Sequence, residues 1–513
     1  TWRNETEHHS RRLVQTKTTN IARFCRMADT ATMTESSQNA RNSRGQPPHS
    51  DANAPEDAHT EQDNASPQKR IVRNVSILMA GRALNAPLAL LHTSLAIRLL
   101  GAHDFGLIVL LYAFARTVGD IADFQSWQTV LNFGSESLGR RDINAFHRIL
   151  RFGLTLDIAG GFFGALIGAA FAWLGRDWLG WPNSLTLLGP LYATSIFFMA
   201  SATPVGVLRL LNKYSLISAQ SVVATVVRLV GTLILWAWGG GVTAMAAVWM
   251  LAEFASCVTL FGFATLELAK RDLLRGLLER PGQIFEDLFR GGISRAFPGV
   301  WRFALTTNLN STLTLAFGHI GTLVIGGMLG PVSASYYRVG SQIAAGIAKP
   351  ATLVQSTLYP EMTRLWNKRD TLHLYVLAVR AALAAGALGS ALLCFAWFLG
   401  GPILQIVIGP NGADALPLTM WLLGAEVVAI WGLPLEPLLF TMRRIGAVII
   451  ARGLDAMLYL PLLVLTTEWY GLDGAGPAIL GATVFLVLMQ LGFVWRLSGS
   501  KPTGIDAPPK DSA

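Results

Sequence analysis

The sequence predicts an all-α protein that crosses a membrane about twelve times, with its helices in two six-helix lobes. Of the 513 residues, 52% are hydrophobic and only 14% are charged, against roughly 25% charged in soluble proteins. So few charged residues cannot coat a globule in water. Apolar runs of spanning length, about 20 residues each, recur along the chain, and this favours a polytopic membrane protein.

Turn-like breaks bound each of these apolar runs, and we expect a helix over each. The twelve predicted helices lie at 75–99, 106–127, 149–174, 185–206, 215–237, 243–266, 301–328, 333–356, 372–399, 416–440, 445–467 and 474–497.

The polar segments divide the chain. The first of them contains no apolar stretch that resembles a secretory signal, and its composition predicts disorder. The chain begins with Thr1 rather than Met, so we expect the natural start at Met27 or Met33. The predicted segments are a disordered cytoplasmic tail (1–69), an N-terminal lobe (70–266), a basic cytoplasmic linker (267–300), a C-terminal lobe (301–497) and a cytoplasmic tail (498–513).

The linker has an apolar face at helical spacing, which predicts an amphipathic helix on the inner membrane surface. A solvated charged linker is the alternative. The residues of this face are Leu273, Leu274, Leu277, Leu278, Phe285, Leu288 and Phe289.

Alternate loops differ sharply in positive charge. The loops on one side hold eighteen Lys and Arg residues, whereas the opposite loops hold only Arg176. Cytoplasmic loops carry the positive excess, so both termini are predicted to be cytoplasmic. The same rule explains the excess of 41 Lys and Arg over 32 Asp and Glu better than nucleic-acid binding does. The three cysteines are too widely spaced to suggest a disulfide framework or a metal site.

Two short matches indicate an internal repeat. Leu100-Gly101 corresponds to Leu329-Gly330 at an offset of 229 residues, and Asn212-Lys213 corresponds to Arg443-Arg444 at an offset of 231. Six helices followed by six in the same orientation predict a parallel repeat about an axis along the membrane normal, as in many transporters.

Thirteen ionisable residues fall inside the predicted spans. If its side chain faced lipid, each would raise the free energy of membrane insertion by about 2.5–3.5 kcal/mol. The total would exceed the stability of an ordinary domain, so most must face water, a partner charge or an interface. They are Arg82, Arg116, Asp120, Asp123, Asp157, Arg228, Glu253, Arg338, Lys349, Arg380, Glu426, Arg452 and Asp455.

Many of these charges recur at three- and four-residue spacing with other polar residues, which places them on single helix faces. We expect these faces to line a central cavity. The predicted substrate-binding residues are Arg82, Asn85 and His92 on the first helix, Arg116 on the second, Arg228 on the fifth, Asn308 and His319 on the seventh, and Arg338, Gln342 and Lys349 on the eighth.

Five further charged residues are candidates for gating or ion coupling. Applying the 229-residue offset makes Asp120 equivalent to Lys349, so a salt bridge between the lobes is one hypothesis for a gate. Plainer alternatives are neutralising pairs, Arg116 with Asp120 and Arg452 with Asp455, and a structural hydrogen bond for His319. The five residues are Asp120, Asp123, Glu253, Arg452 and Asp455.

Three stretches resemble the polysaccharide and lipid-linked oligosaccharide flippases of the multidrug/oligosaccharidyl-lipid/polysaccharide exporter superfamily. They are AIRLLGAHDFGLIVL at 96–110, VLRLLNKYSLISAQ at 207–220, and LVIGGMLGPVSASYYRVGSQIAAGIAKPATLVQSTLYPEMTRL at 323–365. The resemblance covers about residues 70 to 497. One departure is His319, which stands where the family often carries Asp, and this puts the coupling ion in doubt.

The resemblance implies two six-helix lobes in the bacterial inner membrane around a cationic cavity lined by helices one, two, seven and eight. It implies a polyprenyl-diphosphate-linked glycan as cargo, membrane lipids and polysaccharide polymerase machinery as partners, and no enzymatic activity. No GxxxxGK[ST] nucleotide loop occurs. We therefore expect no cofactor, and we expect an ion or the membrane potential to drive transport.

Two other functions compete with this one. A cation-coupled multidrug antiporter of the same superfamily would favour an acidic, aromatic cavity, whereas the predicted cavity is mainly basic. A membrane polysaccharide polymerase or glycosyltransferase would need a sizeable catalytic region, but the predicted outer loops are short. A purely structural membrane protein would have no reason to keep so many buried charges.

Overall fold

The computed structural model describes residues 67–175, 181, 185–277 and 292–498, with side chains except those of 67–84, 309–317, 349–357, 445 and 497–498. Every regular element in these ranges is a helix. The N-terminal lobe contains α2 (Pro67–Ala122), α3 (Ser126–Gly139), α4 (Ile143–Leu174), α5 (Leu188–Ala193), α6 (Ile196–Met199), α7 (Ala202–Leu210), α8 (Tyr214–Trp238) and α9 (Val242–Ala269).

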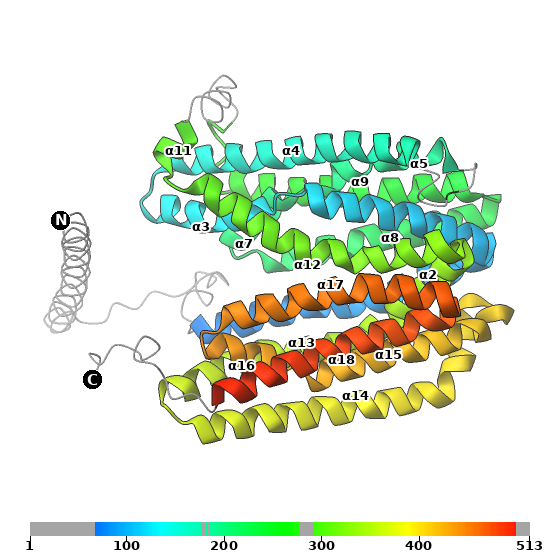
Figure 1. Ribbon diagram of the computed structural model, residues 1–513. Coiled ribbons are helices and arrows are strands. Elements are labelled where there is room, and N and C mark those ends of the chain that lie inside the picture. The colour runs from blue at the N-terminus through cyan, green and yellow to red at the C-terminus, as the bar shows by residue number, and fades with distance from the viewer. Residues whose placement is uncertain (1–66, 176–180, 182–184, 278–291, 499–513) are drawn as a thin grey trace, which may run out of the picture. The chain divides into compact units, whose positions relative to one another are not determined.

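The C-terminal lobe follows the short helix α11 (Gly292–Ala296). Figure 1 shows α4, α8 and α9 within one group of helices and α14, α15 and α18 within another. The helices of this lobe are α12 (Val300–Leu329), α13 (Pro331–Asn367), α14 (Thr371–Ile408), the 3₁₀ helix η2 (Pro410–Ala415), α15 (Leu416–Trp431), α16 (Leu435–Thr441), α17 (Ile445–Tyr470) and α18 (Leu472–Ser498).

The predicted all-α membrane fold is confirmed. Nine helical runs among the described residues are long and apolar enough to span a membrane. The first of them, Asn85–Gly139, contains two predicted spans, while η2, α15 and α16 together form one. The helices α12 and α13, which carry the predicted polar faces of helices seven and eight, complete the set of twelve.

The internal repeat appears in the backbone at the positions that the sequence pairs. Gly101 interrupts α2 with φ 81° and ψ 164°, and Gly330 separates α12 from α13 with φ 87° and ψ 177°. A residue without a Cβ atom adopts this conformation most easily. Asn212 and Arg443 are likewise both left-handed, with φ 57° and 60°, and directly precede the N-caps of α8 and α17.

A third repeated feature is the start of α4 and α14. The Asp142 carboxylate accepts a hydrogen bond of 2.9 Å from the backbone N–H of Ala145, and Asp370 accepts one of 3.2 Å from His373. Each aspartate therefore caps its helix by satisfying an otherwise unpaired N–H group. The two lobes are built on the same turns.

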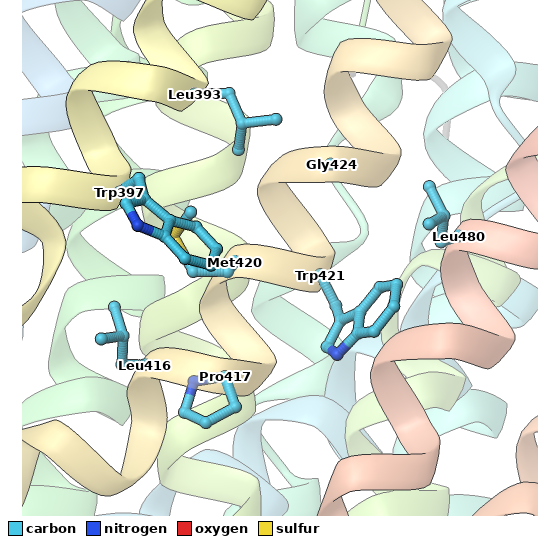
Figure 2. A pocket seen from close by; sticks show the side chains of 8 residues that line it. All are labelled: Leu393, Trp397, Leu416, Pro417, Met420, Trp421, Gly424 and Leu480. Carbon is cyan, nitrogen blue, oxygen red and sulfur yellow. The ribbon is translucent and has the colours of Figure 1, made fainter.

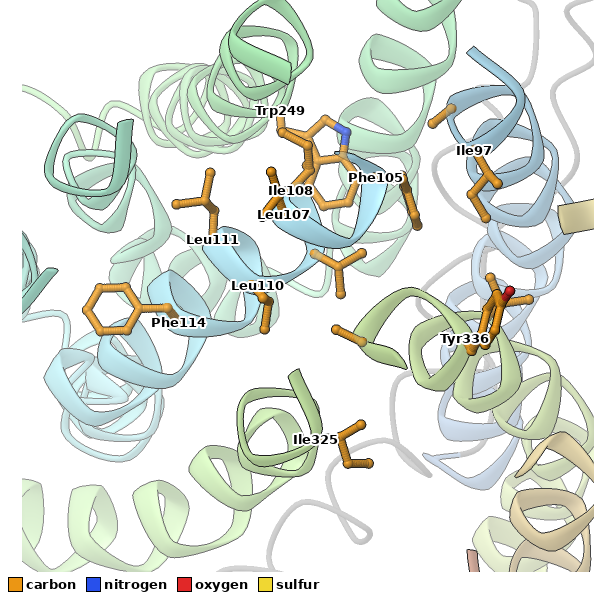
Figure 3. Packing of buried hydrophobic residues seen from close by; sticks show 14 of the residues in the cluster. Ile97, Phe105, Leu107, Ile108, Leu110, Leu111, Phe114, Trp249, Ile325 and Tyr336 are labelled. Carbon is orange, nitrogen blue, oxygen red and sulfur yellow. The ribbon is translucent and has the colours of Figure 1, made fainter. Parts of the chain in front are cut away.

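The two lobes meet closely along α2. A Cβ atom at Gly106 would lie 1.9 Å from the backbone oxygen of Pro331, and one at Gly326 would lie 2.2 Å from Leu110. Figure 3 shows Leu110 on the α2 segment beside the helix that carries Ile325, in a buried apolar cluster that includes residues of both lobes. Only glycine permits these helix-to-helix distances.

One predicted helix is interrupted. The second predicted helix, 106–127, breaks after Ala122, and α3 begins at Ser126. Gln125 has a left-handed conformation with φ 47°, which ends the first helix and redirects the chain. The last residues of the predicted helix therefore belong to α3 rather than to the helix of Asp120.

The linker also differs from the prediction. Residues 270–277 form turns rather than a helix, and Leu277 is buried with Leu273 and Leu274 in an apolar cluster of the N-terminal lobe that includes Phe146. These leucines pack on protein instead of facing a membrane surface. Leu278, Phe285, Leu288 and Phe289 lie outside the described residues.

Candidate functional site

Several predicted site residues gather around the ring of Tyr112 on α2. We call this group the Tyr112 cluster; it consists of Tyr112, His92, Arg228, Trp249, Glu253, His319 and Arg338. Trp249 and His319 approach the Tyr112 ring edge-on, with centroid distances of 5.2 Å and 6.0 Å. The cluster joins α2, α8 and α9 of one lobe to α12 and α13 of the other.

Arg228 lies inside the N-terminal lobe. Its guanidinium donates to the Glu253 carboxylate, and both side chains are 12% exposed. The Arg228 Cζ atom also lies 4.9 Å from the centre of the Tyr112 ring and 4.6 Å from that of Trp249. A buried charge needs a partner of this kind, because an uncompensated ion is very costly away from water.

Arg338 reaches the same ring from the C-terminal lobe, with its Cζ atom 5.4 Å from the Tyr112 centroid. Among the described residues it forms no ion pair with a carboxylate. The charged side chain that shares the Tyr112 ring with it is Arg228, which is also cationic. The cluster therefore carries an unneutralised positive charge where the two lobes meet.

Of the other residues predicted on helices one and eight, His92 packs in this cluster and Gln342 contacts the residue that follows it. The His92 ring lies 5.5 Å from that of Trp249, and the His92 Nε2 atom has no hydrogen-bond partner among the described residues. Thr93, the next residue along the chain, donates to Gln342 across the lobes at 3.1 Å. The buried Asn85 Oδ1 also lacks a partner in the described part of the chain.

A second group of predicted residues lies at the break between α2 and α3. Arg116 donates to Asp120 at 2.9 Å, as the neutralising-pair alternative requires. The Asn308 amide donates to the backbone oxygen of Asp123 at 2.8 Å, which joins α12 to the end of α2. The Asp123 carboxylate accepts a hydrogen bond from Gln125 at 2.9 Å.

Two residues central to the sequence prediction lie outside this description. The side chains of Arg82 and Lys349 are among those that the structure does not describe. The predicted salt bridge between Asp120 and Lys349 thus remains a prediction.

The predicted pair of Arg452 with Asp455 is replaced by another. Arg452 pairs with Glu436 of α16 at 2.8 Å, while the Asp455 Oδ1 atom is buried with no partner among the described residues. The prediction failed because spacing along one helix does not show that a carboxylate on another helix, Glu436, lies within reach of Arg452.

Asp157 holds the broken helices of the N-terminal lobe in place. Its carboxylate, on a residue that is 2% exposed, accepts hydrogen bonds from the Ser126 hydroxyl at 2.5 Å and from the backbone N–H of Thr203 at 2.7 Å. These donors lie in the first turns of α3 and α7, where a negative charge is favourable.

The C-terminal lobe contains a separate apolar cavity of about 660 Å³ between α14, α15 and α18. Figure 2 shows Trp397 on one helix and Trp421 and Gly424 on a neighbouring helix around the cavity. It contains none of the predicted site residues, and its lining holds no ionisable side chain: Leu393, Trp397, Leu416, Pro417, Met420, Trp421, Gly424 and Leu480.

The sequence reasoning missed Tyr112 and Trp249, although a signal was present. Tyr112 precedes Arg116 by four residues, and Trp249 precedes Glu253 by four. Each aromatic ring therefore continues a predicted polar face by one turn. Extending those faces to aromatic residues would have found both.

Comparison with known proteins identifies relatives. Residues 71–366 match the family described as polysaccharide biosynthesis protein. The chain is 27% identical to the inner membrane protein YghQ of Escherichia coli (strain K12) over an alignment of 350 residues. This alignment covers 68% of this chain and 96% of YghQ.

Solved structures share the fold. An inward-facing multidrug resistance MATE family transporter of the MOP superfamily matches with a TM-score of 0.68 and 14% identity, over 84% of this chain and 98% of that chain. The lipid II flippase MurJ in an inward closed conformation matches with a TM-score of 0.61 and 14% identity, over 82% of this chain and 87% of that chain. These likenesses confirm the two-lobe fold that the sequence predicts.

Proposed function

Because the chain belongs to the polysaccharide biosynthesis protein family of the multidrug/oligosaccharidyl-lipid/polysaccharide exporter superfamily, we propose that it flips a polyprenyl-diphosphate-linked oligosaccharide across the bacterial inner membrane. The chain is a multi-pass inner membrane transporter of that superfamily. The proposal concerns its cargo, the residues that bind it and the direction of transport, which is from the inner to the outer leaflet.

One observation supports this cargo most strongly. Arg228 and Arg338 come from opposite lobes to the same Tyr112 ring, and Arg338 has no carboxylate partner in the described part of the chain. A diphosphate headgroup carries charge that is costly in a low-dielectric region. Arginine stays protonated and presents a fork of donors that matches phosphate oxygens.

The headgroup would bind between the lobes while the polyprenyl tail stays in lipid. Rocking of the lobes then exposes the site to each leaflet in turn. Contacts between the lobes that break in this motion include the hydrogen bond of Asn308 to Asp123 and the proposed pair of Asp120 with Lys349. An ion or the membrane potential drives the cycle, with both termini in the cytoplasm and polysaccharide polymerase machinery as the partner.

The test is leaflet translocation of a polyprenyl-diphosphate-linked sugar in vesicles. Arg338→Ala removes charge-assisted contacts, so we expect its flipping rate to fall about 10- to 100-fold. Arg380→Ala, which changes an exposed arginine on α14, is the matched control and should flip at the rate of the unaltered protein. Equal flipping by both variants would remove Arg338 from the site.

A cation-coupled multidrug antiporter is the second candidate. The observation that favours it is Asp455 of the C-terminal lobe, which has a buried carboxylate oxygen without a partner among the described residues. Efflux of a cationic dye from the same vesicles, without translocation of the lipid-linked sugar, would support this alternative.

A further inference from the structure

Tyr112 holds a position that no other described residue shares. Its ring is the one described aromatic ring that guanidinium groups approach from both lobes, at 4.9 Å for Arg228 and 5.4 Å for Arg338. The two guanidinium groups carry the same charge and repel each other. The negative face of an aromatic ring attracts each of them and offsets part of that repulsion.

The ring itself is held in place. Trp249 of α9 and His319 of α12 both meet it edge-on, at interplanar angles of 80° and 90°. With neighbours from both lobes, the ring has little freedom to turn. The separation of Arg228 from Arg338 is therefore set by the position of Tyr112.

Both guanidinium groups keep donors for a ligand. Arg228 donates to Glu253, but its Nε–H, although buried, has no partner among the described residues. Leaving a buried donor unpaired is unfavourable, so an acceptor that enters the cluster is favoured. Arg338 has no carboxylate partner in the described ranges.

We propose that Tyr112 is a positioning residue that spaces Arg228 and Arg338 so that the two guanidinium groups clamp one diphosphate, each taking one phosphoryl group. The inference rests on the proposed function and adds to it that the site measures the length of the anionic headgroup. A monophosphate engages one arginine only, so the site prefers a lipid diphosphate to the corresponding lipid monophosphate.

The experiment compares the affinities of the purified full chain for polyprenyl diphosphate and polyprenyl monophosphate. The unaltered protein should prefer the diphosphate about tenfold, as expected for one added charge-assisted contact. Tyr112→Leu should lose this preference, while Tyr112→Phe, which keeps the ring, should retain it. Phe114→Leu is the control, because Phe114 lies on the same helix and contacts Phe171 and Trp181 but neither arginine.

An unchanged preference in Tyr112→Leu would overturn the clamp and leave the proposed cargo intact. Failure of the unaltered protein to bind polyprenyl diphosphate would instead overturn the proposed cargo and the clamp together. Inorganic pyrophosphate separates the two sources of the anion. Weak competition supports a lipid headgroup, whereas competition as strong as that of the lipid would overturn the lipid assignment.

Discussion

The two lobes share their turns but bury different side chains at equivalent positions. The offset of 231 residues that relates Asn212 to Arg443 makes Tyr459 the equivalent of Arg228 and Val484 that of Glu253. A buried ion pair in the N-terminal lobe is therefore matched by uncharged residues in the C-terminal lobe, where the hydroxyl groups of Tyr459 and Tyr337 both lie close to Gly321.

A second difference concerns helix continuity. Asp157 holds the starts of α3 and α7 in the N-terminal lobe. The equivalent position, 228 residues later, is Ala385. Next to it, Gly386 packs beneath the ring of Trp431, where a Cβ atom would lie 2.3 Å from the ring. In the lobe with a broken second helix, a buried carboxylate joins the helices at this position. In the lobe with the continuous helix α13, close apolar packing joins them. Shared turns set the fold, and the unshared charges distinguish the roles of the lobes.

The largest effect is expected from breaking the ion pair. Glu253→Ala leaves Arg228 buried without its counter-charge and should lower the free energy of unfolding by about 3–5 kcal/mol. Importing the C-terminal pair, as Arg228→Tyr with Glu253→Val, should recover much of that loss, because neither position then carries a buried charge without its partner. Thermal unfolding in detergent measures both variants.

The control for this comparison is Arg452→Ala. It breaks the pair with Glu436, in which the Arg452 side chain is 47% exposed. Such exposed pairs contribute only about 0–1 kcal/mol to the free energy of unfolding. A double variant no more stable than Glu253→Ala alone would show that the two lobes are not interchangeable at these positions.

A smaller loss is expected at Asp157. Asp157→Ala removes the carboxylate that accepts from the Ser126 hydroxyl and leaves the Thr203 N–H without its partner in a buried site, and should lower the free energy of unfolding by about 2–4 kcal/mol. Asp157→Asn keeps an acceptor oxygen and should lose less. Denaturant unfolding followed by tryptophan fluorescence is the measurement; a stable Asp157→Ala protein would contradict the assigned role.

The smallest effects are expected at the repeated helix caps. Asp142→Ala should lower the free energy of unfolding by about 1 kcal/mol. Asp370→Ala should lower the melting temperature as well. The hydrogen bond from His373 lowers the pKa of Asp370 below its usual range. Its stabilising effect is therefore present above the pKa of an unfolded aspartate and is lost as the pH falls through the folded pKa. Melting curves between pH 3 and pH 7 should show this loss only when Asp370 is present.

The fold was predictable because its signals are local. Apolar run length identified the spans, and the pairs Gly101 with Gly330 and Asn212 with Arg443 marked turns that need unusual backbone angles. The break at Gln125 was not predictable in this way. No proline or glycine marks it, and a carboxylate 32 residues further along the chain helps to hold it.

The candidate site was predictable only in part. Helical spacing placed Arg228 and Glu253 on inward faces, but spacing along one helix cannot state which face of a second helix lies opposite. For this reason it paired Arg452 with Asp455 rather than with Glu436. Tyr112 was missed because the search was restricted to charged and polar side chains.

The contact of Gly106 with Pro331 limits how this chain can vary. The backbone oxygen of Pro331 occupies the space that any side chain at 106 would need, and a backbone atom cannot rotate aside as a side chain can. Position 106 therefore tolerates no substitution unless the two helices separate there. Across related chains, we expect this glycine to be retained even where the arginines differ with the cargo.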